Sequence, residues 1–435
     1  MDVATFVTRF LGPVPVRIRA FDGSVAEPAR PTPVSLVLRS RDGLARILTR
    51  PGELGLARAY VTGGLDVEGD LRALVDLEIP RIDPWRHLGD LAALVASVGP
   101  DVLRPRTPPA IEARPRGRRH ARGRDRATVT HHYDVSNEFY ALVLGPSMAY
   151  SCAVFAEGDD DLTSAQTRKV DLVARKLGLG PEHRLLDIGC GWGTMAIHAA
   201  RAYGTRVVGI TLSEPQAALA RERAAAAGVG DLTEFRVADY RDVADGPFDA
   251  ISSIGMVEHV GRRALPEYVS RVVGLLAPGG RYLNHAIARP SARPLNPTPT
   301  RASEVRDTLV DLLGRRASRT HSPFIDRYVF PDGELHEVGS IVTRFQRAGL
   351  ELAHLESLRE HYALTLDAWV ANLEAHAAEA ESLVGAERLR VWRLYMTASS
   401  AAFTRHHLEV HQALFVKPDG GRSGLPRRPA WALAA

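Results

Sequence analysis

The chain has 435 residues, of which 45% are hydrophobic and 24% are charged, and its formal net charge is +4. This balance is typical of a globular protein that is long enough for more than one hydrophobic core. No apolar run approaches the roughly 20 residues of a membrane-spanning helix, and residues 1–23 lack the residue order of a secretory signal, so we expect a cytoplasmic protein. Cys152 and Cys190 are the only cysteines, which argues against a disulfide framework or a thiolate zinc site, and we expect no metal centre.

Residues 1–103 predict a small α+β domain at the amino terminus. Short apolar runs at 34–38 and 44–48 alternate with turn signals, and residues 52–60 indicate a loop followed by a helix. The composition changes after Leu103. Residues 104–130 contain four prolines and nine arginines but only two acidic residues, which predicts a basic linker.

From residue 131 onward, short apolar strands alternate with helices. The strands are expected at 184–187, 206–210, 234–237, 248–254 and 281–285, and the helices at 194–203, 213–227, 265–276, 367–383 and 386–406. This alternation predicts an α/β domain, 131–417, with a mostly parallel sheet and helices on both faces. Residues 288–319, rich in Pro, Arg and Ser, predict an insertion or lid, and 418–435 a disordered tail.

The loop at 185–193 is the most informative single feature of this domain. Gly189, Gly191 and Gly193 allow a tight turn and the close approach of a ligand, and Asp187 places a carboxylate at the carboxyl end of a strand, where ligands bind in open α/β sheets. The spacing differs from that of dinucleotide-binding and P-loop motifs. It is similar to motif I of class I methyltransferases, whose glycines face the amino-acid part of S-adenosylmethionine. A glycine turn that serves packing alone is the alternative.

Two later segments are expected to complete a nucleotide site. Thr211, Leu212 and Gln216 follow the second strand and would lie near the ribose and adenine of the cofactor. Asp239 and Tyr240 would offer a polar group and an aromatic face for the base. An ordinary capping turn between strand and helix explains the same residues equally well.

Several separated strings resemble the cyclopropane fatty acid synthase and mycolic acid methyltransferase family. They lie at residues 131–139, 148–153, 208–213, 255–261, 324–335 and 361–369. Residues 52–60 are similar to the amino-terminal domain of the bacterial members that act on phospholipids. The resemblance covers nearly the whole chain and implies a class I methyltransferase (Rossmann-like) fold with S-adenosylmethionine as cofactor.

The resemblance also implies a set of site residues. Tyr150 and Ser151 would contact the cofactor. The implied catalytic positions, which in the family hold a bicarbonate ion beside the reacting carbon, are Cys152, Glu258, His285 and Tyr362. Each of these four also has a structural alternative: a small buried hydrophobe, a carboxylate at a helix start, a hydrogen-bonded core histidine and a packed aromatic ring.

The implied reaction adds a one-carbon unit to the double bond of an unsaturated fatty-acyl phospholipid. An alkene is a weak nucleophile, so it must be held in line with the sulfonium methyl in a site that excludes water. The resulting carbocation needs an apolar pocket with aromatic faces or anions, and a base must remove a proton to close a cyclopropane ring. Bicarbonate is the base that the resemblance implies. If a hydride shifts first, the product is a methylene branch, which a reductase partner could convert to a methyl branch, and this outcome stays open.

The basic segment and the separate amino-terminal domain favour peripheral association with an anionic membrane face, since each exposed cation contributes up to about 1 kcal/mol near acidic lipid. A solvated linker is the alternative. Nucleic acid is not expected, because no aromatic residues interleave the arginines of 104–126. The expected partners therefore include a membrane surface, and a homodimer stays open. The rival functions are a methyltransferase for small amines or phospholipid headgroups and a non-catalytic lipid-binding protein.

Overall fold

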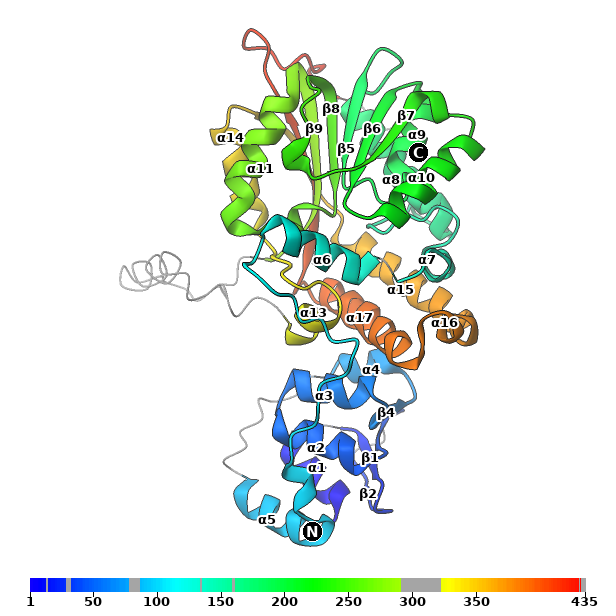
Figure 1. The fold of residues 1–435 in the computed structure, drawn as a ribbon, viewed down its shortest axis with the longest axis vertical. Helices are drawn as coiled ribbons and strands as arrows, with labels where there is room; N and C mark the ends of the chain where they lie inside the picture. The colour runs from blue at the N-terminus through cyan, green and yellow to red at the C-terminus, as the bar shows by residue number, and fades with distance from the viewer. Residues whose placement is uncertain are drawn as a thin grey trace, which may run out of the picture. The chain divides into compact units, whose positions relative to one another are not determined.

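The computed structural model describes residues 1–12, 15–28, 33–77, 87–133, 135–158, 161–290, 322–429 and 431. The chain divides into two compact units, each of which is described by itself (Figure 1). Unit 1 comprises Met1–Arg114, Ser322–Pro331 and Leu373–Ala401, and unit 2 comprises Pro115–His321, Asp332–Asn372 and Ala402–Ala435. The lid expected at 288–319 lies outside the described residues from position 291 onward.

Unit 1 contains the small α+β domain that the sequence predicts. Its elements up to residue 103 are α1 (Val3–Leu11), β1 (Arg17–Ala20), β2 (Val25–Ala26), β3 (Ser35–Leu38), α2 (Arg41–Thr49), α3 (Glu53–Val61), β4 (Leu65–Glu68), α4 (Leu71–Val75), α5 (Leu88–Val98) and the 3-10 helix η2 (Pro100–Leu103). The strands pair in the order β2-β1-β3-β4, with β1 and β3 parallel. Helix α1 begins at the side chain of Asp2 and buries Val3, Phe6, Val7 and Phe10, the i, i+3, i+4, i+7 pattern of an amphipathic helix.

Later parts of the chain return to unit 1, although the sequence placed them in the second domain. They form α13 (Pro323–Tyr328), α16 (Ala377–Val384) and most of α17 (Ala386–Thr404). Their contacts are specific: Arg390 pairs with Asp66 at 3.2 Å, and the Tyr328 hydroxyl donates to Glu112 at 3.2 Å. Such pairings join residues more than 200 positions apart, which local sequence patterns do not reveal.

Unit 2 contains a seven-stranded sheet among its described residues, in the order β10-β11-β9-β8-β5-β6-β7. The strands are β5 (Arg184–Ile188), β6 (Arg206–Thr211), β7 (Thr233–Val237), β8 (Phe248–Ile254), β9 (Leu276–Ala288), β10 (Glu351–Ser357) and β11 (Glu409–Val416). Neighbouring strands from β9 to β7 are parallel, whereas β11 is antiparallel to both β9 and β10. The five strands predicted from the sequence are all present, and the mostly parallel sheet is confirmed.

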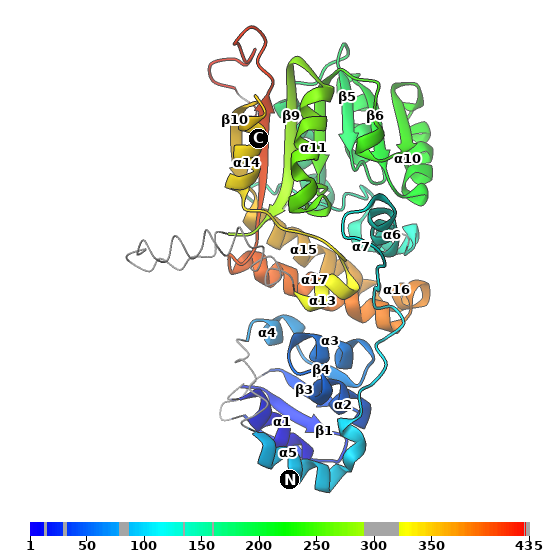
Figure 2. The same ribbon diagram turned by 60° about the vertical axis from the view of Figure 1, so that its left-hand side comes forward.

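Helices cover both faces of this sheet (Figures 1 and 2). One face packs against α11 (Gly261–Leu275) and α14 (Val338–Arg347), and the other against α8 (Leu162–Leu177), α9 (Thr194–Tyr203) and α10 (Glu214–Ala226). Both faces of the sheet are apolar, because successive strand residues point to opposite faces. On β5, for example, Leu186 lies in the hydrophobic core on the α11 side and Leu185 in the core on the α8 side. The remaining elements are α6 (Arg122–Tyr133), α7 (Asn137–Leu144), α15 (Arg359–Ala375) and the 3-10 helices η3 (Gly230–Leu232), η4 (Tyr240–Asp242) and η5 (Val257–His259).

Three details differ from the sequence expectations. The helix predicted at 367–383 begins earlier, as α15, and a break at His376 separates it from α16. Residues 122–130, expected within a linker, form the first part of α6. The tail expected to be disordered, 418–435, is described to residue 429 and at Trp431, whose ring centroid lies 5.4 Å from that of His354.

Candidate active site

The glycine loop follows β5 and is held against β6. Gly189, Gly191 and Gly193 all have positive φ, at 79°, 54° and 82°, a conformation that side chains disfavour. The Gly189 amide donates to Ile210 O at 2.9 Å. A Cβ at Gly193 would lie 3.0 Å from the Phe235 ring, whereas a Cβ at Gly191 would meet no atom of the described residues within 4 Å. Gly193 therefore serves packing, and Gly191 faces open space, which fits a ligand that approaches the backbone.

Two opposite charges lie buried beside this loop. Asp187, at 2% exposure, accepts a hydrogen bond from Ser252 Oγ at 2.6 Å, and burial raises its pKa to about 6 against the opposing effects of Ser252 and Lys169. Lys169 of α8, also 2% exposed, donates from Nζ to Ser151 Oγ at 2.9 Å. Burial lowers the pKa of Lys169 to about 8, although Cys152 and Asp187 favour its charged form. Ser151, the expected cofactor contact, is thus held by a buried ammonium.

A chain of aromatic rings leads from the glycine loop to Tyr362. Consecutive ring centroids along Trp192, Tyr140, Tyr150, Trp369 and Tyr362 are 4.7, 5.7, 5.3 and 6.1 Å apart. Trp192 belongs to the loop itself, and four of the five residues are buried. Trp369 Nε1 is buried without a hydrogen-bond acceptor within the described part of the chain. We call this set the aromatic wall, and it provides the apolar faces that a carbocation site requires.

The polar residues expected near the ribose form hydrogen bonds within their own strand-to-helix turn. Thr211 Oγ1 donates to Gln216 Oε1 at 2.7 Å, and Ser213 caps α10 by accepting from the Gln216 amide at 3.4 Å. Thr211 and Gln216 are buried, and Leu212 is half-buried. These contacts are those of the capping turn, so a ribose contact at Thr211, Leu212 or Gln216 stays a prediction.

Cys152 and Tyr362 meet at one backbone carbonyl. The Cys152 Sγ lies 3.1 Å from Ala153 O and 3.5 Å from Leu358 O, and the Tyr362 amide donates to Leu358 O at 3.1 Å. Leu358 is in turn tied to β11, because its amide donates to Val410 O at 2.9 Å. Complete burial raises the pKa of Cys152, so the residue is a neutral thiol and not a thiolate.

His285 is oriented by a relay of buried polar side chains. Lys176 Nζ donates to Gln412 Oε1 at 2.7 Å, which fixes the Gln412 amide so that its nitrogen donates to His285 Nδ1 at 3.2 Å. The hydrogen of the neutral imidazole is therefore on Nε2. Burial holds the pKa of His285 well below its usual range, which keeps the ring neutral. His285 Nε2 is buried and has no partner among the described residues.

Glu258 presents a second unpaired atom. Its Oε1 accepts from the Ile287 amide, two residues beyond His285 on β9, at 2.6 Å, while Oε2 is buried without a partner in the described segments. Burial raises the pKa of Glu258 to about 7. Glu258 and His285 are thus linked to the paired strands β9 and β11, because Ile287 pairs with Val410 and His285 pairs with Gln412. Leu358, which Cys152 and Tyr362 contact, is hydrogen-bonded to Val410 of the same strand β11.

The buried atoms of Glu258 and His285 that lack partners among the described residues have the hydrogen-bonding chemistry that a small oxyanion needs. His285 Nε2 is a donor, and the Glu258 carboxyl can donate or accept, since a pKa near 7 allows both forms at neutral pH. Bicarbonate both donates and accepts hydrogen bonds, so the donor set is compatible with the ion that the sequence resemblance implies.

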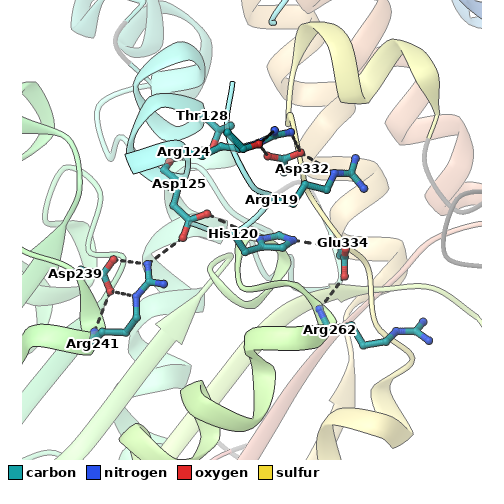
Figure 3. Close-up of polar contacts among 11 residues, drawn as sticks. Arg119, His120, Arg124, Asp125, Thr128, Asp239, Arg241, Arg262, Asp332 and Glu334 are labelled. Atoms are coloured by element: carbon teal, nitrogen blue, oxygen red, sulfur yellow. Dashed lines mark hydrogen bonds and ion pairs between the residues drawn. The ribbon is translucent and has the colours of Figure 1, made fainter. Parts of the chain in front are cut away.

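Residues 115–130 of the basic segment belong to unit 2, and several of their arginines pair with carboxylates of that unit (Figure 3). Arg124 and Arg119 both donate to the buried Asp332, with Arg124 Nη2 at 2.6 Å and Arg119 Nε at 2.9 Å. Arg122 pairs with Asp242 at 2.7 Å. Much of the positive charge expected to face solvent or lipid is therefore neutralised within the fold.

The same network reaches Asp239, the residue expected near the adenine. Asp239 binds Arg241 at 2.6 Å, and Arg241 also binds Asp125 of α6 at 2.9 Å (Figure 3). His120 lies between Asp125 and Glu334, with ring nitrogens 3.9 and 3.5 Å from their carboxylate oxygens. Asp239 is thus positioned by α6, a contact that only the fold reveals.

Tyr240, the other expected adenine contact, packs edge-on against Tyr268, with the centroids 5.1 Å apart. Burial raises its pKa, so the phenol stays neutral. This packing holds the ring in place, and a contact with the adenine stays a prediction.

Sequence reasoning missed Lys169, Lys176 and Gln412. A signal existed for the two lysines, since the chain has only three lysines among its 55 Lys and Arg residues and these two are seven positions apart on one helix face. Gln412 gave no signal, because a polar residue within a strand is ordinarily exposed.

Comparisons with known proteins agree with the geometry. The family model described as mycolic acid cyclopropane synthetase matches residues 120–413. A probable fatty acid methyltransferase of Mycobacterium tuberculosis is 43% identical over 97% of this chain and 95% of its own length. The tuberculostearic acid methyltransferase of the same organism is 33% identical over 93% of this chain and 88% of its own length.

A solved structure adds the cofactor. The crystal structure of the mycolic acid cyclopropane synthase CmaA1, complexed with SAH and CTAB, matches with a TM-score of 0.58 at 32% identity, over 67% of this chain and 97% of that one. SAH is the demethylated form of S-adenosylmethionine. The chain therefore belongs to the mycolic acid cyclopropane synthetase family and is an S-adenosylmethionine-dependent methyltransferase.

Proposed function

We propose that this methyltransferase adds a one-carbon unit to the cis double bond of an unsaturated fatty-acyl chain of a phospholipid and closes a cyclopropane ring. The observation that carries the proposal is that the buried atoms Glu258 Oε2 and His285 Nε2 have no hydrogen-bond partner among the residues that the structure describes. Methyl transfer to an amine or a hydroxyl needs no such pair, whereas ring closure needs a base beside the transferred carbon.

The chain's residues exclude water and stabilise positive charge. When bound, S-adenosylmethionine supplies an electrophilic methyl group on a sulfonium. The rings of Tyr150, Trp369 and Tyr362 form an apolar surface on which a cation on the acyl chain is stabilised by aromatic faces. The exclusion of water there prevents capture of the cation as an alcohol.

The polar cluster is proposed to hold bicarbonate, which would supply the base for the final proton. His285 donates from Nε2, and Gln412 keeps the ring in that tautomer. Glu258 binds through Oε2 while Oε1 stays anchored to the strand. Cys152 and the Tyr362 phenol would complete the cluster by the family resemblance.

A methylene branch is the second candidate product. The observation that favours it is the full-length similarity to a relative named tuberculostearic acid methyltransferase, since the cyclopropane synthase of known structure matches only 67% of this chain. Both products share the same first step, and in both the transferred methyl carbon loses the final proton. They differ in whether a hydride first moves from the methyl-bearing carbon to the neighbouring cationic carbon. A separate reductase would then be needed to produce a methyl branch.

A direct assay distinguishes these outcomes. The protein is incubated with S-adenosylmethionine and vesicles that carry oleoyl phospholipid, and the released fatty acids are analysed by gas chromatography and mass spectrometry. A cyclopropane ring supports the main proposal, and a methylene branch supports the second. A methylated headgroup or unchanged lipid refutes both. His285→Ala should abolish turnover and keep SAH binding, whereas wild-type turnover in this variant would remove the assigned role.

Membrane association is proposed separately. No helix in the described segments combines the length and apolar character needed to cross a bilayer. Arg116, Arg118 and Arg126 have no carboxylate partner within the described part of the chain, so they are available to acidic headgroups. Sedimentation with anionic vesicles, reduced when all three are changed to serine and absent with neutral vesicles, supports peripheral binding. Equal sedimentation of the variant and the wild type contradicts it.

A further inference from the structure

The chain uses arginine at nearly every basic position, and only Lys169, Lys176 and Lys417 are lysines. A guanidinium has five donors, cannot lose its charge in a protein and is difficult to bury beside few acceptors. Lysine at a buried position of such a chain therefore indicates a need for a small cation. Two of the three have evident structural partners. Lys176 binds Glu356 and Gln412, and Lys417 donates to two backbone carbonyls.

Lys169 differs from the other two. Its side chain is buried, and Ser151 Oγ is its one acceptor among the described residues, which leaves two of the three ammonium hydrogens without a partner. Asp187 acts on Lys169 electrostatically but accepts its hydrogen bond from Ser252, and no ion pair joins the two within the described segments. A desolvated cation with one neutral acceptor is unfavourable unless an anion joins it.

The direction of the hydrogen bond shows where that anion would bind. Because Lys169 donates to Ser151 Oγ, the hydroxyl hydrogen of Ser151 points to another acceptor, and the ammonium strengthens it as a donor. Ser151 follows Tyr150 of the aromatic wall and precedes Cys152 of the catalytic cluster. Two anions of one chemistry belong to the proposed reaction here: the carboxylate of the cofactor's methionine part, and bicarbonate.

We infer that Lys169 is a positioning residue that supplies, through Ser151 Oγ, the buried positive charge for a carboxylate-type anion in this site. The inference rests on the proposed assignment of Ser151 to the cofactor. The charged and titratable groups that act on Lys169 are Asp187 from β5, His285 from β9, His198 from α9 and Cys152 from the segment before α8. A pKa of about 8 means that Lys169 is charged at neutral pH, and anion binding should weaken as the pH rises above that value.

The test is Lys169→Met, which keeps the length of the side chain and removes the charge. Calorimetry in bicarbonate-free buffer measures the affinity for SAH and for 5′-methylthioadenosine, which lacks the amino-acid part. We expect SAH to bind roughly 10- to 100-fold more weakly and 5′-methylthioadenosine to bind as before, which would identify the cofactor carboxylate as the anion. If SAH affinity is unchanged but added bicarbonate raises the melting temperature of the wild type alone, the anion is bicarbonate. Wild-type behaviour in both measurements overturns the inference.

A matched control separates this role from ordinary packing. Lys417→Met removes a lysine of the same unit whose ammonium binds Val273 O at 2.9 Å and Leu276 O at 2.7 Å. It should lower the melting temperature and leave SAH affinity unchanged. Lys169→Met should instead raise the melting temperature, because it removes a desolvated charge, and it should weaken SAH binding. A lower melting temperature with equal losses for SAH and 5′-methylthioadenosine would show a packing role and refute the inference.

A double variant tests the route through the hydroxyl. Ser151→Ala and Lys169→Met should each weaken SAH binding, and together they should weaken it little more than either alone, since both remove one interaction. Additive losses would contradict a role through Ser151. None of these measurements requires lipid turnover, so a failure of the proposed function and a failure of this inference are distinguishable.

Discussion

The buried carboxyl of Glu258 gives the most quantitative prediction. Its pKa rises from 4.5 to about 7 because burial disfavours the charged form. At about 1.4 kcal/mol per pH unit, ionising Glu258 costs about 3 kcal/mol more in the folded protein than in the unfolded chain. A carboxyl with a raised pKa binds its proton more tightly when folded, so the protein loses stability as the pH rises from 4.5 through 7. The loss is about 1 kcal/mol at pH 5 and about 3 kcal/mol at pH 8.

Glu258→Gln removes this pH-dependent loss. Any constant effect of the amide is the same at both pH values, so the stability of the variant relative to the wild type should improve by about 2 kcal/mol between pH 5 and pH 8. For a unit of this size, the difference in melting temperature should rise by roughly 4–8 °C, which thermal unfolding of both proteins at the two pH values measures. Glu182→Gln, at an exposed glutamate of the same unit, should show no such change. A difference that is independent of pH, or that falls as the pH rises, would refute the reasoning.

Three further variants probe the loop, the relay and the basic segment. Gly191→Ala should weaken SAH binding at least tenfold, because its methyl group enters the open space beside the loop, and calorimetry measures this. It should lower the melting temperature less than Gly193→Ala, whose methyl group meets the Phe235 ring, and thermal unfolding measures the difference. Gln412→Leu should lower turnover roughly 10- to 100-fold at unchanged SAH affinity, because His285 loses the bond that fixes its tautomer, and kinetics beside calorimetry measure this. Asp332→Asn should cost about 3 kcal/mol and speed tryptic cleavage after the arginines that it binds, which digestion with mass analysis detects.

Local patterns were sufficient for the α/β unit and for the glycine loop. The strands from 184 to 285 and the helices between them follow from apolar periodicity, caps and turns, which act within a few residues. Ser213, whose side chain caps α10, is a local signal of this kind. The family resemblance supplied the expected site residues, but not their contacts.

Only the tertiary structure showed which carboxylates pair with the arginines of the basic segment. It also showed that residues 322–331 and 373–401 belong to unit 1. The arginines of α6 have an ordinary linker composition until Asp332, more than 200 residues away, is placed beside them. The partner of a charge depends on long-range packing, which leaves no trace in the neighbouring sequence.

The amino-acid sequence by itself determined the type of fold and the glycine loop, because both depend on short spacings. The four positions expected to be catalytic came from the resemblance of whole strings to a known family, and their roles stay predictions. Only the tertiary structure decided which buried polar atoms have partners and which do not. Within the described residues, Glu258 Oε2 and His285 Nε2 lack partners and Lys169 has a single neutral acceptor, because strands and helices distant in sequence bury each of these groups. The free energy of a buried polar group depends on its three-dimensional neighbours, and those exist only once the chain has folded.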